Sequence, residues 1–106
     1  MSEIIVIAHN IRSIHNVGSI FRTSEGFGVS KLILSGYTPY PTIPNDTRLP
    51  HLSAALSKKI NKTALGAEVI VPFEYTLVPP FQALRANGFV IVGLEQDASS
   101  VPISRY

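Results

Sequence analysis

The sequence predicts an α/β fold, with an open parallel sheet and helices on both faces. A short run of β-branched residues, Ile4–Ala8, has the composition of a strand covered on both sides. A stretch with the apolar spacing of a helix follows, and a second apolar run, Lys31–Ser35, comes after a glycine-containing turn. This order of strand, helix and strand is typical of a βαβ unit with parallel strands. A chain of 106 residues suits a single domain over residues 1–106.

The first helix is expected to begin at Asn16 and to end at the glycines Gly26 and Gly28. An asparagine side chain can accept a hydrogen bond from the free amides of the first turn, which makes Asn16 a candidate N-cap. Glycine is common where helices end. The residues expected to form the buried face recur at helical spacing: Val17, Ile20, Phe21 and Ser24.

The middle of the chain, Gly36–Asn61, contains four prolines and is expected to be mostly irregular, with a short helical piece around Leu52–Lys58. Loops of this length in compact domains are often functional, although a stiff connector fits the composition equally well. The remaining expected elements are a helical turn, a strand, a helix and a strand: Thr63–Ala67, Glu68–Phe73, Phe81–Ala86 and Phe89–Leu94.

The composition excludes several classes of site. The chain has no cysteine, which excludes a thiolate zinc site, a disulfide and a cysteine nucleophile. His9 and His15 have no carboxylate at ligand spacing, so no metal is expected. The net charge of +2 permits RNA binding without requiring it, because Lys58, Lys59 and Lys62 fit an ordinary solvated face. The chain shows no signal peptide or span of membrane length, so we expect a cytoplasmic protein with no membrane partner.

Several ordered blocks resemble the SpoU (also called TrmH) family of RNA ribose 2′-O-methyltransferases, of the SPOUT superfamily. Its first motif, an asparagine, a spacer, Asn-Val-Gly, three residues and Arg-Thr, matches Asn10, Asn16–Gly18 and Arg22-Thr23. Further blocks match in the same order along the chain: Gly26–Gly28, Leu34–Pro39, Lys62–Glu68 and Gly93–Gln96. The resemblance implies an RNA partner, tRNA or rRNA, and S-adenosyl-L-methionine as cofactor.

The resemblance also implies that the family's second and third motifs lie beyond Tyr106. These motifs include a serine-leucine-asparagine segment that threads the trefoil knot and forms most of the cofactor pocket. We therefore expect the Rossmann-like N-terminal part of the domain, with the knot segment missing, an incomplete cofactor site and no methyl transfer by this chain alone. Leu94 and Glu95 are implied to line the adenosine pocket, although Glu95 also fits an ordinary carboxylate at a strand end.

In such a family the motif arginine, which matches Arg22, activates the ribose hydroxyl and orients the adjacent phosphate. Asn16 matches the motif asparagine and is assigned to holding Arg22 or the ribose, or to capping the helix. Gly18 lies one turn before Arg22 on the same face, so it leaves space for a nucleotide or permits close packing. From helical periodicity alone, Arg22 is interpreted as a surface arginine that pairs with Glu25, three residues later.

Two further arginines, Arg12 and Arg48, are candidate RNA ligands, and an exposed loop position is the plain alternative for Arg12. Tyr37 and Tyr40 lie in the same proline-rich region as Arg48 and are candidates for base stacking. The alternative function is a non-catalytic module of the same ancestry that binds RNA or a partner. An unrelated nucleotide-binding domain is disfavoured, because no Gly-x-Gly-x-x-Gly follows a strand. An apolar edge left uncovered leads us to expect a homo-oligomer.

Overall fold

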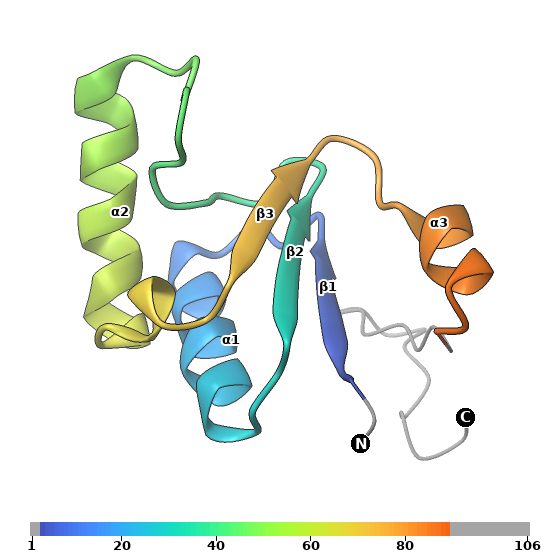
Figure 1. Ribbon diagram of the computed structural model, residues 1–106. Coiled ribbons are helices and arrows are strands. Elements are labelled where there is room, and N and C mark those ends of the chain that lie inside the picture. Colours follow the sequence, from blue (N-terminus) through green and yellow to red (C-terminus); the bar gives the residue numbers. More distant parts are fainter. Residues whose placement is uncertain (1–2, 90–106) are drawn as a thin grey trace.

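A computed structural model describes residues 3–89 as an open sheet of parallel strands with helices packed against it. The sheet consists of β1 (Ile5–His9), β2 (Lys31–Ser35) and β3 (Phe73–Thr76), in the spatial order β1-β2-β3 (Figure 1). Ile5 lies opposite Lys31, and Leu32 lies opposite Phe73. The predicted α/β class and parallel sheet are therefore confirmed.

Within residues 3–89, three α-helices and one 3-10 turn connect or follow these strands. α1 (Ile14–Gly26) links β1 to β2, and α2 (Pro50–Ala64) together with η1 (Ala67–Val69) links β2 to β3. α3 (Phe81–Ala86) follows β3, and α2 and α3 lie at opposite ends of the row of strands (Figure 1). After β3 the chain therefore crosses to the side of the sheet on which β1 lies (Figure 1).

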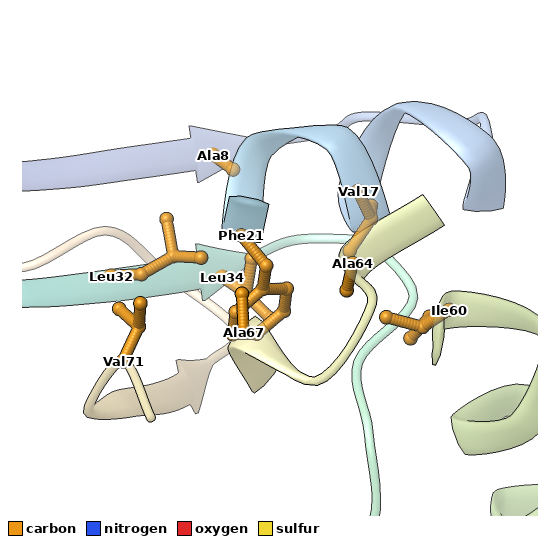
Figure 2. Packing of buried hydrophobic residues seen from close by; sticks show 9 residues of the cluster. All are labelled: Ala8, Val17, Phe21, Leu32, Leu34, Ile60, Ala64, Ala67 and Val71. Atoms are coloured by element: carbon orange, nitrogen blue, oxygen red, sulfur yellow. The ribbon is translucent and has the colours of Figure 1, made fainter. Parts of the chain in front are cut away.

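The hydrophobic core lies between the sheet and the two long helices (Figure 2). Phe21 of α1 is fully buried and meets the ring of Phe73 edge to face, with centroids 5.3 Å apart. Burying a phenylalanine of this kind contributes about 1.5–3 kcal/mol. The cluster contains residues of β1, α1, β2, α2 and η1 and one residue that follows η1: Ala8, Val17, Phe21, Leu32, Leu34, Ile60, Ala64, Ala67 and Val71.

Gly18 permits the close approach of α1 and α2. A Cβ atom at this position would lie 1.8 Å from Thr63 Oγ1 and 2.6 Å from the backbone oxygen of Ile60. The expectation that Gly18 leaves room for a nucleotide is therefore wrong, because α2 fills that space. The contact joins the two helices, since the Thr63 hydroxyl also donates a hydrogen bond to the His15 carbonyl at 2.9 Å.

Two predicted elements in the middle of the chain differ from the structure. The region expected to be mostly irregular, with a short helical piece, contains most of α2, which is 15 residues long, begins at Pro50 and continues past Asn61 to Ala64. The strand expected at Glu68–Phe73 is replaced by η1, and β3 begins only at Phe73. Exposure explains the second error, because Val69 and Ile70 are 86% and 64% exposed and so do not form a buried strand.

The first two strands and the first and last helices agree with their predictions to within one or two residues, whereas the helical turn predicted at Thr63–Ala67 is divided between the end of α2 and the start of η1. β1, β2 and α3 lie where the apolar runs and the prolines placed them. The first helix begins earlier than predicted, because Ser13 is its N-cap and accepts a hydrogen bond from the backbone N–H of Asn16 at 3.1 Å. The predicted fourth strand, Phe89–Leu94, lies outside the described residues except for its first position.

Candidate functional site

Two loops meet at the carboxyl edge of the sheet, where ligands bind in open α/β folds. The loop after β1 is held to the turn after β2 by hydrogen bonds between Asn10 N and the Ser35 carbonyl, 3.1 Å, and between Ile11 N and Thr38 Oγ1, 3.0 Å. The backbone N–H of Tyr37 donates to the Asn10 side-chain oxygen at 3.1 Å. Motif residues far apart in the sequence are therefore fixed side by side.

Gly36 allows this close approach. Its φ of +66° is in the left-handed region, and a Cβ atom would lie 1.9 Å from Asn10 Oδ1. The Gly36 carbonyl accepts a hydrogen bond from the Tyr75 hydroxyl, and its N–H donates to the Leu77 carbonyl at 3.1 Å. The turn after β2 is thus anchored both to the loop after β1 and to the end of β3.

Arg12 lies in the loop after β1, directly before Ser13, the N-cap of α1. Its side chain is exposed, and its Cζ atom lies 5.6 Å from the centre of the Tyr37 ring. The first turn of α1 carries no acidic residue. Free amides at a helix start favour an anion, so the surroundings of Arg12 suit a phosphate group.

Arg22 lies two turns further along α1 and is also exposed. Within residues 3–89 the ion pairs join Lys31 to Glu74 and Arg48 to Asp46. The alternative interpretation of Arg22 as the partner of Glu25 is therefore not supported by the geometry. Its guanidinium is exposed to solvent and has the planar shape that binds phosphate oxygens in pairs.

Asn16 lies inside the first turn of α1 and is half-buried, so it is not the helix cap that the sequence suggested. It lies six residues before Arg22 in α1, which is between one and two helical turns, and both follow the loop that holds Arg12. Its assignment to orienting Arg22 or a ribose remains a prediction. The sequence does contain the signal for the correct cap, because Ser13 is a preferred N-cap residue that directly precedes the apolar helical pattern.

Arg48, a predicted RNA ligand, is instead anchored within its own loop. Its guanidinium donates two hydrogen bonds to Asp46, at 2.9 and 2.6 Å, and one each to the carbonyls of Tyr40 and Pro41. It also lies 3.6 Å from the centre of the Tyr40 ring, which stacks on Tyr75 at 4.0 Å. Four of its five N–H groups thus donate hydrogen bonds within the loop, so Arg48 stabilises the loop conformation.

This arrangement shifts the pKa values of the loop. The hydrogen bond from the Arg48 side chain holds the pKa of Asp46 well below its ordinary value of 3.8. Burial raises the pKa of the Tyr40 phenol, and the nearby Arg48 charge partly offsets this effect. The Asp46 carboxylate is therefore ionised at neutral pH, when it accepts both bonds from the guanidinium.

The remaining predictions concern metals, membranes and the cofactor. Among residues 3–89, no group of three histidine or acidic side chains is placed to hold a metal ion, and His9 Nδ1 lies 3.0 Å from Ser35 Oγ. None of the helices in this part of the chain is both long and apolar enough to span a membrane. Leu94 and Glu95 lie outside the described residues.

The sequence profile of the SpoU rRNA Methylase family matches residues 3–106. The chain belongs to this family. It is also 24% identical over 106 residues to the mouse tRNA (guanosine(18)-2′-O)-methyltransferase TARBP1, matching all of this chain and 6% of that protein. A crystal structure of an rRNA methyltransferase from Sinorhizobium meliloti superposes with a TM-score of 0.62 at 24% identity. The superposition covers 93% of this chain and 33% of that one, and it shows the shared fold.

Proposed function

We propose that this chain provides the RNA-binding and hydroxyl-activating part of an S-adenosylmethionine-dependent RNA ribose 2′-O-methyltransferase acting on tRNA or rRNA. The observation that carries the proposal is the position of Arg12 and Arg22. Both are exposed, both follow the carboxyl end of β1, and neither forms an ion pair within residues 3–89. Membership of the SpoU family supports the assignment to RNA methylation.

In this proposal Arg22 acts on the ribose. A ribose hydroxyl has a high pKa, and a positive charge beside it stabilises the negative charge that develops on the oxygen as its proton passes to solvent and the oxygen attacks a methyl group. Arg12 holds a phosphate of the RNA backbone near the start of α1, and Asn16 orients Arg22 or the ribose. S-Adenosylmethionine supplies the methyl group when bound, and Leu94 and Glu95 are the residues proposed to contact its adenosine.

We further propose that the 106 residues do not catalyse methyl transfer by themselves. The serine-leucine-asparagine segment of the family's knot is absent from their sequence. A longer protein, in which the family's C-terminal motifs follow Tyr106, is therefore expected to bind the cofactor in calorimetry. The 106-residue chain is expected to bind RNA and not the cofactor.

Substitution of Arg22 tests the proposed mechanism. In the longer protein, Arg22→Ala is expected to lower the rate of transfer of tritiated methyl groups to RNA by about 10²–10³, as for loss of a group that stabilises developing charge. Arg22→Lys is expected to retain part of the rate, because it keeps the charge and loses the planar fork. Arg85→Ala, an exposed change on α3, is the matched control and is expected to leave the rate unchanged.

An unchanged rate with Arg22→Ala contradicts the proposed role of Arg22. If the longer protein binds RNA, but binds no cofactor and transfers no methyl group, the alternative of a non-catalytic RNA-binding module is correct. If neither protein binds RNA, the proposed function is wrong.

A further inference from the structure

We propose that Tyr37 and Arg12 form a stacking platform for one unpaired nucleobase of the RNA substrate. The inference rests on the proposed function and adds a contact to it. The Tyr37 ring would stack on the base, and the Arg12 guanidinium, which lies over the ring, would neutralise the neighbouring phosphate. Single-stranded RNA is commonly bound in this way, by aromatic and guanidinium planes beside a positive charge.

Exposure singles out Tyr37 among the tyrosines at this edge of the sheet. Tyr37 is 58% exposed, so most of its surface is open to a ligand. Tyr40, in contrast, is in contact with the Arg48 guanidinium at 3.6 Å and with the ring of Tyr75 at 4.0 Å. Tyr75 is further occupied by the hydrogen bond from its hydroxyl to the Gly36 carbonyl. A base can therefore stack on Tyr37 without breaking an internal contact of the other two rings.

The backbone of Tyr37 is fixed although its side chain is exposed. Its N–H donates to Asn10 Oδ1 at 3.1 Å, and the next residue, Thr38, is buried and donates its hydroxyl to the Ala8 carbonyl at 2.9 Å. The preceding residue, Gly36, is held by Tyr75. An aromatic ring on a backbone fixed in this way loses little conformational entropy when a base stacks on it.

Arg12 gives this surface its preference for nucleic acid. Its Cζ atom lies 5.6 Å from the centre of the Tyr37 ring, within the range of a cation–π contact, and its side chain is exposed. In contrast to Arg48, it forms no ion pair with a carboxylate among residues 3–89. A flat aromatic ligand that carries a negative charge satisfies both side chains at once, and a nucleotide has both properties.

The test uses the 106-residue chain and a short single-stranded RNA that contains one 2-aminopurine base, whose fluorescence is quenched when it stacks. Tyr37→Ala is expected to weaken RNA binding about tenfold, about 1.4 kcal/mol, and to abolish the quenching. Tyr37→Leu keeps an apolar side chain and is expected to behave like alanine, whereas Tyr37→Phe keeps the ring and is expected to resemble the wild type. Phe27→Ala is the control, because Phe27 is 78% exposed at the other end of α1.

The outcomes separate this inference from the proposed function. If the wild type binds RNA and Tyr37→Ala leaves both affinity and quenching unchanged, the platform is overturned and the proposed function stands. If Tyr37→Phe is as defective as Tyr37→Ala, the ring is not the stacking surface and the platform is also overturned. If the wild type binds no RNA, both proposals fail. Thermal unfolding of each variant, followed by circular dichroism, verifies that the variants are folded.

Discussion

The three arginines predicted as RNA ligands have the same chemistry and different surroundings. Arg48 donates four hydrogen bonds within its loop, whereas Arg12 and Arg22 are exposed and make no ion pair within the described part of the chain. The difference arises from one neighbour, because Asp46 is two residues before Arg48 and accepts the guanidinium. The sequence predicted all three as RNA ligands, and the proposal keeps the two whose side chains are exposed.

The pair of Asp46 and Arg48 predicts a pH dependence of stability. The pKa of Asp46 is lowered in the folded chain, so its carboxylate contributes stability that is fully present above its ordinary value of 3.8. This contribution is lost as the pH falls from about 4 toward the lower folded value. Asp46→Asn is expected to lower the unfolding midpoint at neutral pH and to reduce its dependence on pH below about 4.

Glu74→Gln is the matched control for this prediction. Glu74 pairs with Lys31 at 3.3 Å, but both side chains are more than 40% exposed, so solvent screens the pair. Its substitution is expected to change the midpoint little. Thermal unfolding followed by circular dichroism between pH 2 and 7 measures both effects, and an Asp46→Asn profile that parallels the wild type contradicts the assignment.

At the level of secondary-structure elements, the contact between α1 and α2 positions the candidate site. The last turn of α2 packs against Gly18 and donates the Thr63 hydroxyl to the His15 carbonyl at the start of α1. The start of α1 in turn follows the loop that carries Arg12. A substitution at the contact between α1 and α2 is therefore expected to change the stability of the whole domain.

Gly18→Ala is expected to destabilise the fold. The added methyl group would overlap Thr63 Oγ1 and the Ile60 backbone oxygen, and overpacking of this kind costs about 1–3 kcal/mol. The gain in helix propensity, about 1 kcal/mol, offsets only part of this cost. Gly26→Ala is the control in the same helix, because nothing lies within 4 Å of its added Cβ atom. Urea unfolding measures both variants, and equal stability for the two would contradict the packing argument.

The sequence correctly predicted those elements that are marked by a pattern within their own residues or next to them. The apolar runs of β1 and β2 and the prolines before α3 are such patterns, and these elements lie where they were expected. α2 was recognised only as a short piece because its buried face is sparse, with Ser53, Ile60 and Ala64 as the buried positions. β3 was misplaced because a four-residue strand depends on pairing with β2, which no local pattern reveals.

At the scale of the whole molecule, the described part of the chain leaves a group of apolar side chains uncovered around η1. Leu65, Val69 and Ile70 are 62%, 86% and 64% exposed, and they follow one another closely at the end of α2. Apolar groups of this kind often mark contact surfaces, and β3 adds the open edge of the sheet nearby. We therefore predict that the chain forms a homo-oligomer through this surface.

We expect light scattering of the 106-residue chain to give a mass above the 11.5 kDa of a monomer, and Val69→Lys to shift the mass toward that value. The lysine charge cannot be buried in an apolar contact without a large desolvation cost, whereas it is well solvated in a monomer. Leu52→Lys is the control, because Leu52 is also exposed, at 51%, and lies in the first turns of α2, away from η1. A wild-type monomer contradicts the prediction outright. An oligomer that survives Val69→Lys and dissociates with Leu52→Lys places the contact on α2 instead, so the two variants locate the surface as well as test it.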